Sequence, residues 1–212
     1  MSEPIPIVHL VDDDVSFLKA ASRLLKASGF TVAAFDSAAE LLAHLSAGSR
    51  GCVVADLHMP GVGGLELQED LLKLGLSLPV VFLTGQGNIA SSVRAMRLGA
   101  EDFLEKRAPK APLLDAVNRA LAREATEHTR RTRQQALRSL FAALTPRERE
   151  VLTHVLRGGH NKEIALALNI HERTVKLHRT AITTKLGVST VAEVSRLAQE
   201  AGLFDAEPPT FP

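Results

Sequence analysis

The sequence contains very little cysteine, since Cys52 is the single cysteine among 212 residues. A chain with one cysteine cannot form an intrachain disulfide, and this cysteine usage fits a reducing cytoplasm. Apolar residues make up 45% of the chain and charged residues 23%, as in an ordinary globular protein. We therefore expect the fold to rest on an apolar core.

Long apolar runs are also missing. No stretch approaches the roughly 18 apolar residues that a membrane-spanning helix needs. The opening residues, MSEPIPIVHLVDDD, lack a basic segment and reach acidic residues too early for a secretory signal. These absences predict a cytoplasmic protein that does not use a membrane as a partner.

The net charge is only +1, but the charge is unevenly distributed. Residues 1–120 contain 11 Lys and Arg against 14 Asp and Glu, a net charge of −3. Residues 121–212 contain 14 against 10, a net charge of +4. This contrast suggests two domains with different partners, although a difference of this size also arises by chance.

The first part of the chain alternates between short apolar runs and amphipathic segments. Such runs are typical of strands buried on both faces, and such segments of helices. Strands are predicted at residues 5–11, 30–35, 51–56, 79–84 and 101–104, and helices at 15–27, 38–47, 64–73, 89–98 and from 113 onward. Ser37 is expected to cap the second helix, and Gly29 to end the first. Five strand–helix units in series predict an α/β fold, with a five-stranded parallel sheet, doubly wound and flavodoxin-like.

Residues 122–143 contain neither glycine nor proline and are rich in helix-forming residues. They predict a helical linker with a solvated, basic surface. A disordered linker is the alternative.

Short helices follow the linker and predict a small all-α domain over residues 144–203. Thr145, Pro146 and Glu148 form a capping-box start for a helix that reaches about residue 158. Three more helices are expected: one capped by Asn161 and running to 168, one at 173–186, and one opened by Ser189 and running to 201. The tail 204–212 has three prolines and is expected to be flexible.

Polar side chains stand where four of the predicted strands end. Ligands of open parallel sheets bind at the carboxyl ends of the strands. Crowded carboxylates raise each other's pKa, and a hard cation such as Mg²⁺ relieves this repulsion. One Asp at a strand end is more often a turn or cap residue, as Asp14 is expected to be, but four converging strand ends favour a phosphoryl-binding site. The side chains concerned are Asp12, Asp13, Asp14, Asp56, Thr84 and Lys106.

Four motifs carry a family resemblance: VDDD at 11–14, VADLHMPGVGGLEL at 54–67, FLTGQG at 82–87 and GAEDFLEK at 99–106. In this order and spacing they resemble the receiver domain of bacterial response regulators, over about residues 5–121. The resemblance implies that Asp56 accepts a phosphoryl group. It also implies a Mg²⁺ site made by Asp13 directly, by Asp12 through water, by Asp56 and by the backbone carbonyl of His58.

The same resemblance assigns roles to three further residues. Thr84 and Lys106 would bind the phosphoryl oxygens, and Phe103 would turn inward when the domain switches. Two departures from the family pattern stand out. Arg107 replaces the usual proline after the lysine, which predicts a trans peptide bond and a reshaped loop. Gly63 and Gly64 replace a small polar residue and a glycine, which is expected only to loosen the loop after Asp56.

The region 160–186 reads as helix, turn and longer helix, the pattern of a helix-turn-helix whose second helix enters the major groove of DNA. Residues 144–188 resemble the LuxR-type helix-turn-helix domain, which with the receiver resembles the FixJ/NarL group of transcription regulators. The resemblance implies two sets of DNA contacts, since base contacts specify and phosphate contacts position. Base edges would be contacted by Lys176, Leu177 and Thr180, and phosphates by Asn161, Lys162, Thr174, Arg179 and Lys185.

These observations predict a two-component response regulator. It would consist of a receiver domain at residues 1–121, a helical linker at 122–143, a DNA-binding domain at 144–203 and a tail at 204–212. It would take a phosphoryl group from a sensor histidine kinase, form a homodimer and bind an inverted-repeat promoter, with RNA polymerase as a further candidate partner. It would not be an enzyme beyond catalysing its own phosphorylation and dephosphorylation. Two alternatives stay open: a constitutive DNA-binding regulator with a vestigial receiver, and a small Mg²⁺-dependent phosphatase.

Overall fold

The computed structural model describes residues 5–85 and 89–203. The chain divides into two compact units between His128 and Thr129. The predicted flexible tail, 204–212, lies outside the described residues. Across the described part of the chain, no helix has both the length and the apolar character needed to cross a membrane.

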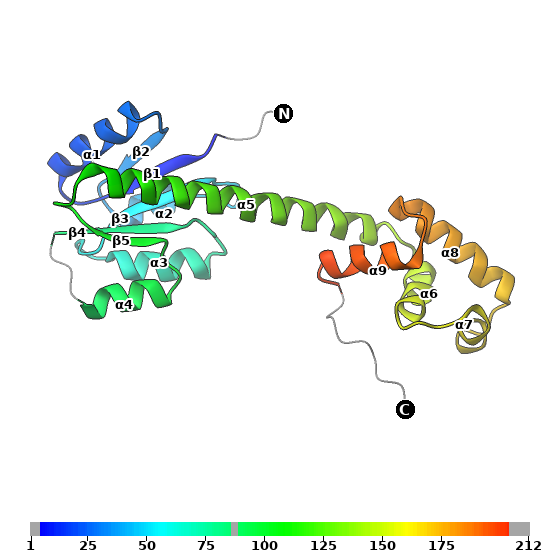
Figure 1. Ribbon diagram of the computed structural model, residues 1–212. Helices are drawn as coiled ribbons and strands as arrows, with labels where there is room; N and C mark the ends of the chain where they lie inside the picture. Colours follow the sequence, from blue (N-terminus) through cyan, green and yellow to red (C-terminus); the bar gives the residue numbers. More distant parts are fainter. Residues whose placement is uncertain (1–4, 86–88, 204–212) are drawn as a thin grey trace. The chain divides into compact units, whose positions relative to one another are not determined.

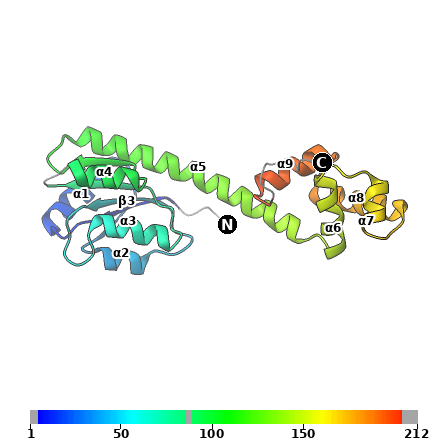
Figure 2. The same cartoon turned by 90° about the horizontal axis from the view of Figure 1, so that it is seen from below.

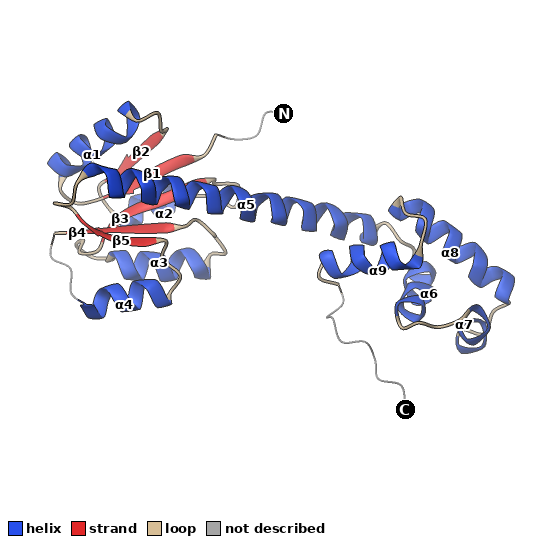
Figure 3. Ribbon diagram, viewed as in Figure 1, coloured by secondary structure: helices blue, strands red, loops and turns tan. Residues whose placement is uncertain are grey.

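The N-terminal unit is built around one parallel sheet in the strand order β2-β1-β3-β4-β5 (Figure 1). The strands are β1 (Ile7–Val11), β2 (Val32–Phe35), β3 (Gly51–Asp56), β4 (Val80–Thr84) and β5 (Asp102–Glu105). The helices between them are α1 (Val15–Ala27), α2 (Ala38–His44), α3 (Gly64–Lys73) and α4 (Ile89–Arg97), and α5 (Lys110–Ala142) follows β5 (Figure 3). The predicted five-stranded, doubly wound fold is confirmed.

Two apolar layers cover the sheet, one on each face. Apolar side chains of α1 and α5 pack on one face, where the sheet contributes Val8, Leu10 and Val54. Helices α2 and α3 lie side by side (Figure 2). Together with α4, their apolar side chains pack on the other face of the sheet, against Val53 and Phe82. The strands carry apolar side chains on both faces for this reason, which is why they read as continuous apolar runs in the sequence.

Element boundaries follow local capping chemistry. Asp14 caps α1 as predicted, because its carboxylate accepts the backbone N–H groups of Ser16 and Phe17. The second helix ends at His44, earlier than predicted, because Leu45 adopts an extended conformation. α5 begins before the predicted residue 113 because Pro112 lies in its first turn, where a missing N–H costs no hydrogen bond.

α5 is one continuous helix of 33 residues, which confirms a helical linker over a disordered one. The expectation that its surface is solvated is wrong at three positions: Glu124, Leu137 and Phe141 are buried. Leu137 and Phe141 belong to the apolar core of the C-terminal unit. The helices of that unit are α6 (Pro146–Leu156), α7 (Asn161–Ala167), α8 (Glu172–Leu186) and α9 (Val191–Glu200).

Two predicted caps in this unit need correction. Asn161 is the first residue of α7 rather than its cap, and its side chain accepts a hydrogen bond from Arg179 instead (3.0 Å). Thr190, not Ser189, caps α9, because its hydroxyl accepts the N–H of Glu193 three residues later. The predicted capping box at Thr145 is present.

Candidate functional site

Three carboxylates gather at the carboxyl ends of β1 and β3. Asp12 and Asp56 are buried and Asp13 is exposed. Each of the three offers an oxygen atom, and these atoms all lie within 4.8 Å of one another. A set of closely spaced carboxylate oxygens with one open side suits a hard divalent cation, so the residues present fit the Mg²⁺ that the sequence predicts.

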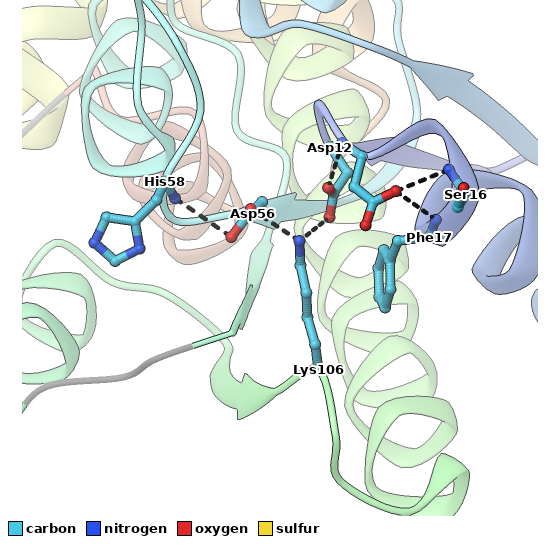
Figure 4. Close-up of polar contacts among 7 residues, drawn as sticks. Asp12, Ser16, Phe17, Asp56, His58 and Lys106 are labelled. Carbon is cyan, nitrogen blue, oxygen red and sulfur yellow. Dashed lines mark hydrogen bonds and ion pairs between the residues drawn. The ribbon is translucent and has the colours of Figure 1, made fainter.

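Lys106 lies between the two buried carboxylates. Its Nζ is 2.7 Å from Asp12 Oδ2 and 2.9 Å from Asp56 Oδ2 (Figure 4). Burial raises the pKa of the Asp12 carboxyl, and the contact with Lys106 offsets this only in part. Burial alone would lower the pKa of Lys106, but its two carboxylate partners outweigh that effect and raise it. Lys106 is therefore held in its charged form inside an acidic pocket.

Backbone N–H groups around the cluster contact the buried carboxylates of Asp12 and Asp56. The carboxylate of Asp14 is engaged in capping α1, while its N–H donates to Asp12 Oδ1 (3.0 Å). The N–H of His58 donates to Asp56 Oδ1 (3.3 Å), so the loop after β3 folds back toward the cluster (Figure 4). The structure thus brings Asp12, Asp13 and Asp56 together, with the backbone of His58 beside Asp56, and a metal-binding role for the His58 carbonyl stays a prediction.

Gly64 is more demanding than the sequence suggested. A Cβ atom at this position would lie 2.4 Å from the backbone oxygen of Asp56 and 2.9 Å from the ring of Phe82. Glycine at this position permits the first residue of α3 to approach the end of β3. The residue that departs from the family pattern is Gly63, where a Cβ atom would lie 3.4 Å from the backbone oxygen of Leu57, so the expectation that this change only loosens the loop stays a prediction. A glycine at the first position of the predicted helix 64–73, after the loop that follows Asp56, was the signal available in the sequence.

Thr84 and Phe103 lie next to this pocket on β4 and β5. Thr84 is fully buried, and its hydroxyl has no hydrogen-bond partner among residues 5–85 and 89–203. Phe103 is partly buried, with its ring centroid 6.3 Å from that of Phe82. Burying a hydroxyl without a hydrogen-bond partner costs free energy of folding.

The loop after Lys106 contains the departure at Arg107. The Lys106–Arg107 peptide bond is trans, as predicted. The N–H of Lys106 donates to the backbone oxygen of Thr84 (2.8 Å), and a turn closes with the N–H of Ala108 donating to Glu105 (2.9 Å). The reach of Lys106 into the acidic pocket is thereby kept without proline.

In the C-terminal unit, α8 separates an inner from an outer face. Val175, Ile182 and Leu186 are buried and form its inner face. The three side chains expected to contact bases, Lys176, Leu177 and Thr180, are all exposed. Of these Leu177 is 64% exposed, so its side chain is accessible on the outer face of α8.

The residues expected to contact phosphates are less uniform. Lys162 is exposed, whereas Asn161 and Thr174 are half-buried. Lys185 pairs with Glu148 (2.7 Å), and this contact lowers the pKa of the Glu148 carboxyl. The sequence indicated Glu148 only as a capping residue, and its partnership with a lysine 37 positions away was missed.

Comparison with known proteins places both units. Residues 8–118 match the response regulator receiver domain family, and residues 142–198 match the luxR family of bacterial regulatory proteins. The chain is 38% identical over 213 residues to the transcriptional regulatory protein FixJ of Azorhizobium caulinodans, covering 99% of each chain. It is 36% identical over 199 residues to the response regulator protein TodT of Pseudomonas putida, covering 94% of this chain and 88% of that one.

Solved structures agree with this placement. The response regulator StyR is similar with a TM-score of 0.83 and 42% identity, over 93% of this chain and 100% of that one. Full-length FixJ from B. japonicum is similar with a TM-score of 0.56 and 34% identity, over 94% and 98%. This chain belongs to the bacterial response regulators that join a receiver domain to a LuxR-type DNA-binding domain.

Proposed function

We propose that this protein regulates transcription from promoter DNA in response to phosphorylation of Asp56 by a sensor histidine kinase. The observation that carries the proposal is the convergence of Asp12, Asp13 and Asp56 with the charged Lys106 at one edge of the sheet. An intact acidic pocket of this kind favours a working receiver over a vestigial one. The sequence-based division into 1–121, 122–143, 144–203 and 204–212 forms part of the proposal, and promoter binding implies that the protein works in the cytoplasm.

The chemistry expected of this chain is an in-line displacement. An oxygen of the Asp56 carboxylate forms a bond to phosphorus while the bond from phosphorus to the nitrogen of a phosphohistidine breaks, and that nitrogen keeps the electron pair. Lys106 already contacts Asp56 and would balance the added negative charge. Mg²⁺, held by Asp12, Asp13, Asp56 and the backbone carbonyl of His58, would supply positive charge to the phosphoryl oxygens. Hydrolysis by water would later return Asp56 to its carboxylate, so the only turnover is of the protein's own phosphate.

The response to phosphorylation would begin at Thr84. A phosphoryl group on Asp56 would offer its buried hydroxyl a hydrogen-bond acceptor. Because that hydrogen bond would offset the cost of burying the hydroxyl without a partner, the Thr84 side chain would move toward the phosphoryl group. Movement of Thr84 on β4 would vacate space beside β5 into which Phe103 can turn. A local electrostatic change would thereby alter the receiver surface formed by α4 and β5 and favour a homodimer.

The DNA-binding surface would be the outer face of α8. Lys176, Leu177 and Thr180 would meet base edges, with the exposed Leu177 suited to the methyl group of thymine. Lys162, Thr174 and Arg179 would contact phosphates, together with Asn161 and Lys185. Two copies related by a two-fold axis would bind an inverted repeat, where RNA polymerase is the candidate next partner.

The test compares wild type with Asp56→Asn, and with Asp115→Asn as a matched control, because Asp115 is exposed on α5. Each protein is treated with Mg²⁺ and a small phosphodonor. The mass of the single chain, the mass of the oligomer in solution and the affinity for a promoter fragment are then measured. Wild type and the control should gain about 80 Da, dimerise and bind DNA about tenfold more tightly, while Asp56→Asn does none of these. Equal DNA binding by all three proteins in every condition would establish the constitutive alternative instead.

A further inference from the structure

The helix α1 carries a one-sided positive charge. Its sequence, VSFLKAASRLLKA, contains Lys19, Arg23 and Lys26 and no carboxylate. The three cations recur at intervals of four and three residues, so they lie along one face over about 10 Å. All three are exposed, and none forms an ion pair with another residue among those the structure describes. Three cations gathered in this way are notable because residues 1–120 are acidic as a whole.

These cations border a groove between α1 and the edge strand β2. The groove has a volume of about 660 Å³. Its floor is formed by the apolar residues Val15, Leu18, Ala27 and Ala34, and Ser22 also lines it between the cations. Val15 is 53% exposed although it is apolar, and Ala34 is an exposed residue of β2. The strand order leaves β2 with one neighbour only, so no further strand covers this side of the sheet. We name this feature, defined by the four floor residues and the three cations, the α1–β2 groove.

The α1–β2 groove is separate from the phosphorylation pocket. The opposite side of α1 presents Phe17, whose ring centroid lies 4.7 Å from Lys106 Nζ. The residues of α1 next to Lys106 are therefore on a different face from the three cations. Nothing in the proposed phosphoryl transfer or in the proposed DNA contacts uses the α1–β2 groove.

We infer that the α1–β2 groove docks an acidic, amphipathic segment of a partner protein. Carboxylates of such a segment at helical spacing would match Lys19, Arg23 and Lys26, and its apolar side chains would cover Val15 and the rest of the floor. An apolar floor distinguishes this occupant from nucleic acid, because a phosphodiester backbone would satisfy the cations but leave the floor in water. Charge complementarity of this kind steers association and makes it sensitive to salt.

The experiment uses the full-length protein and a short fluorescein-labelled peptide composed of Leu and Glu at helical spacing. Binding is followed by fluorescence anisotropy at two salt concentrations, and the contacted residues are located by amide chemical-shift changes. The test variant is Arg23→Glu, at the centre of the basic row. The matched control is Arg97→Glu, which makes the same change at an exposed arginine near the end of α4.

We expect the peptide to bind wild type saturably and more weakly at high salt. The amide chemical-shift changes should be confined to α1 and β2. Arg23→Glu should weaken binding about five- to tenfold, because it removes one attraction and adds a repulsion, and Arg97→Glu should leave it unchanged. Two results would overturn the inference: no saturable binding to wild type, or equal binding by wild type and Arg23→Glu, as expected if the peptide sits on the basic face of α8. A random DNA duplex that loses affinity through Arg23→Glu, when the peptide does not, would identify a nucleic-acid surface instead.

Discussion

Thr84 shows how a residue that is unfavourable for stability can serve the proposed function. Its side chain is buried at the end of β4. Its hydroxyl has no hydrogen-bond partner within the described part of the chain. Burying a hydroxyl without a hydrogen bond costs free energy of folding. A proposed phosphoryl group on Asp56 supplies the missing acceptor, which links the phosphorylated state to a shift of this side chain.

The substitution Thr84→Val tests this link because valine has the same shape without the hydroxyl. The free energy of unfolding of the unphosphorylated protein should stay the same or rise by up to about 1 kcal/mol, as measured by urea denaturation. The phosphorylation-dependent gain in DNA affinity should be lost. Thr126→Val, at an exposed position of α5, is the control and should keep that gain. A clear loss of stability in Thr84→Val would show that the hydroxyl has a partner in the resting protein.

Cys52 is a second residue whose environment predicts its chemistry. The thiol is fully buried in β3, and burial, followed by the nearby carboxylates of Glu124 and Glu101, raises its pKa to about 12. In the unfolded chain the thiol ionises near its ordinary pKa of about 8.5. Above that pH the unfolded state releases a proton that the folded state retains, so folding stability falls as the pH rises.

The predicted slope is about 1.4 kcal/mol per pH unit between the unfolded and folded pKa of this thiol. Urea denaturation of wild type and Cys52→Ala from neutral to alkaline pH measures it. The alanine variant carries a constant penalty for its smaller side chain but lacks this slope, so the two stability curves should converge with rising pH. Parallel curves, or rapid reaction of the native thiol with a thiol reagent at neutral pH, would contradict the buried, protonated state.

At the scale of elements, a buried ion pair fastens α5 to the sheet. Leu113, Ala116 and Ala120 supply the apolar contacts of α5 in the N-terminal unit. Farther along the helix, Glu124 pairs with Arg50 just before β3, with Nε–Oε1 and Nη2–Oε2 distances of 3.1 and 3.2 Å. Both side chains are almost completely buried. A bidentate pair of this kind specifies geometry, because a buried charge without a partner is strongly unfavourable.

Removing one partner of this pair should lower the free energy of unfolding, whereas replacing both partners should change it much less. Glu124→Leu removes the bidentate contact to the buried guanidinium of Arg50 and should lower the free energy of unfolding by about 3–5 kcal/mol. The double variant Arg50→Met with Glu124→Leu should recover most of the loss, because both charges are gone. Thermal and urea denaturation of the four proteins in this cycle provide the measurement. Equal losses in the single and double variants would mean that the pair contributes packing rather than charge.

At the scale of the whole molecule, the two compact units meet within a helix rather than in a loop, because the boundary between His128 and Thr129 falls inside α5. The C-terminal unit therefore includes the end of α5. Leu137 and Phe141 are part of its core, Arg133 pairs with Glu200 of α9, and Arg138 donates to the backbone oxygen of Ala201 (2.8 Å).

We expect a fragment of residues 129–212 to fold cooperatively, and a fragment of residues 144–212 to be much less stable. The shorter fragment lacks two buried apolar side chains, and loss of each costs about 2–5 kcal/mol. Circular dichroism during thermal unfolding compares the two fragments. The same comparison with Phe141→Ala in the longer fragment isolates the contribution of that ring. Equal melting temperatures would show that the helix end is dispensable for the DNA-binding unit.

The sequence by itself determined the type and order of nearly all elements and the position of the acidic pocket. Apolar periodicity follows from backbone geometry, and caps such as Asp14 and Thr145 act within three or four residues, so both are legible in a short stretch of chain. The pocket was predictable for a related reason: parallel strands deliver their carboxyl ends to one edge, so Asp12 and Asp56 had to lie near each other.

Only the tertiary structure decided which side chains pair within that framework. Arg50 and Glu124 are 74 positions apart, and Glu148 and Lys185 are 37 apart, so no local pattern connects them. The close approach that requires Gly64 depends in the same way on how α3 packs against β3. Contacts of this kind form only when whole helices and strands pack together. The distance between two such side chains then depends on the close packing of the core, and not on the residues next to them in the chain.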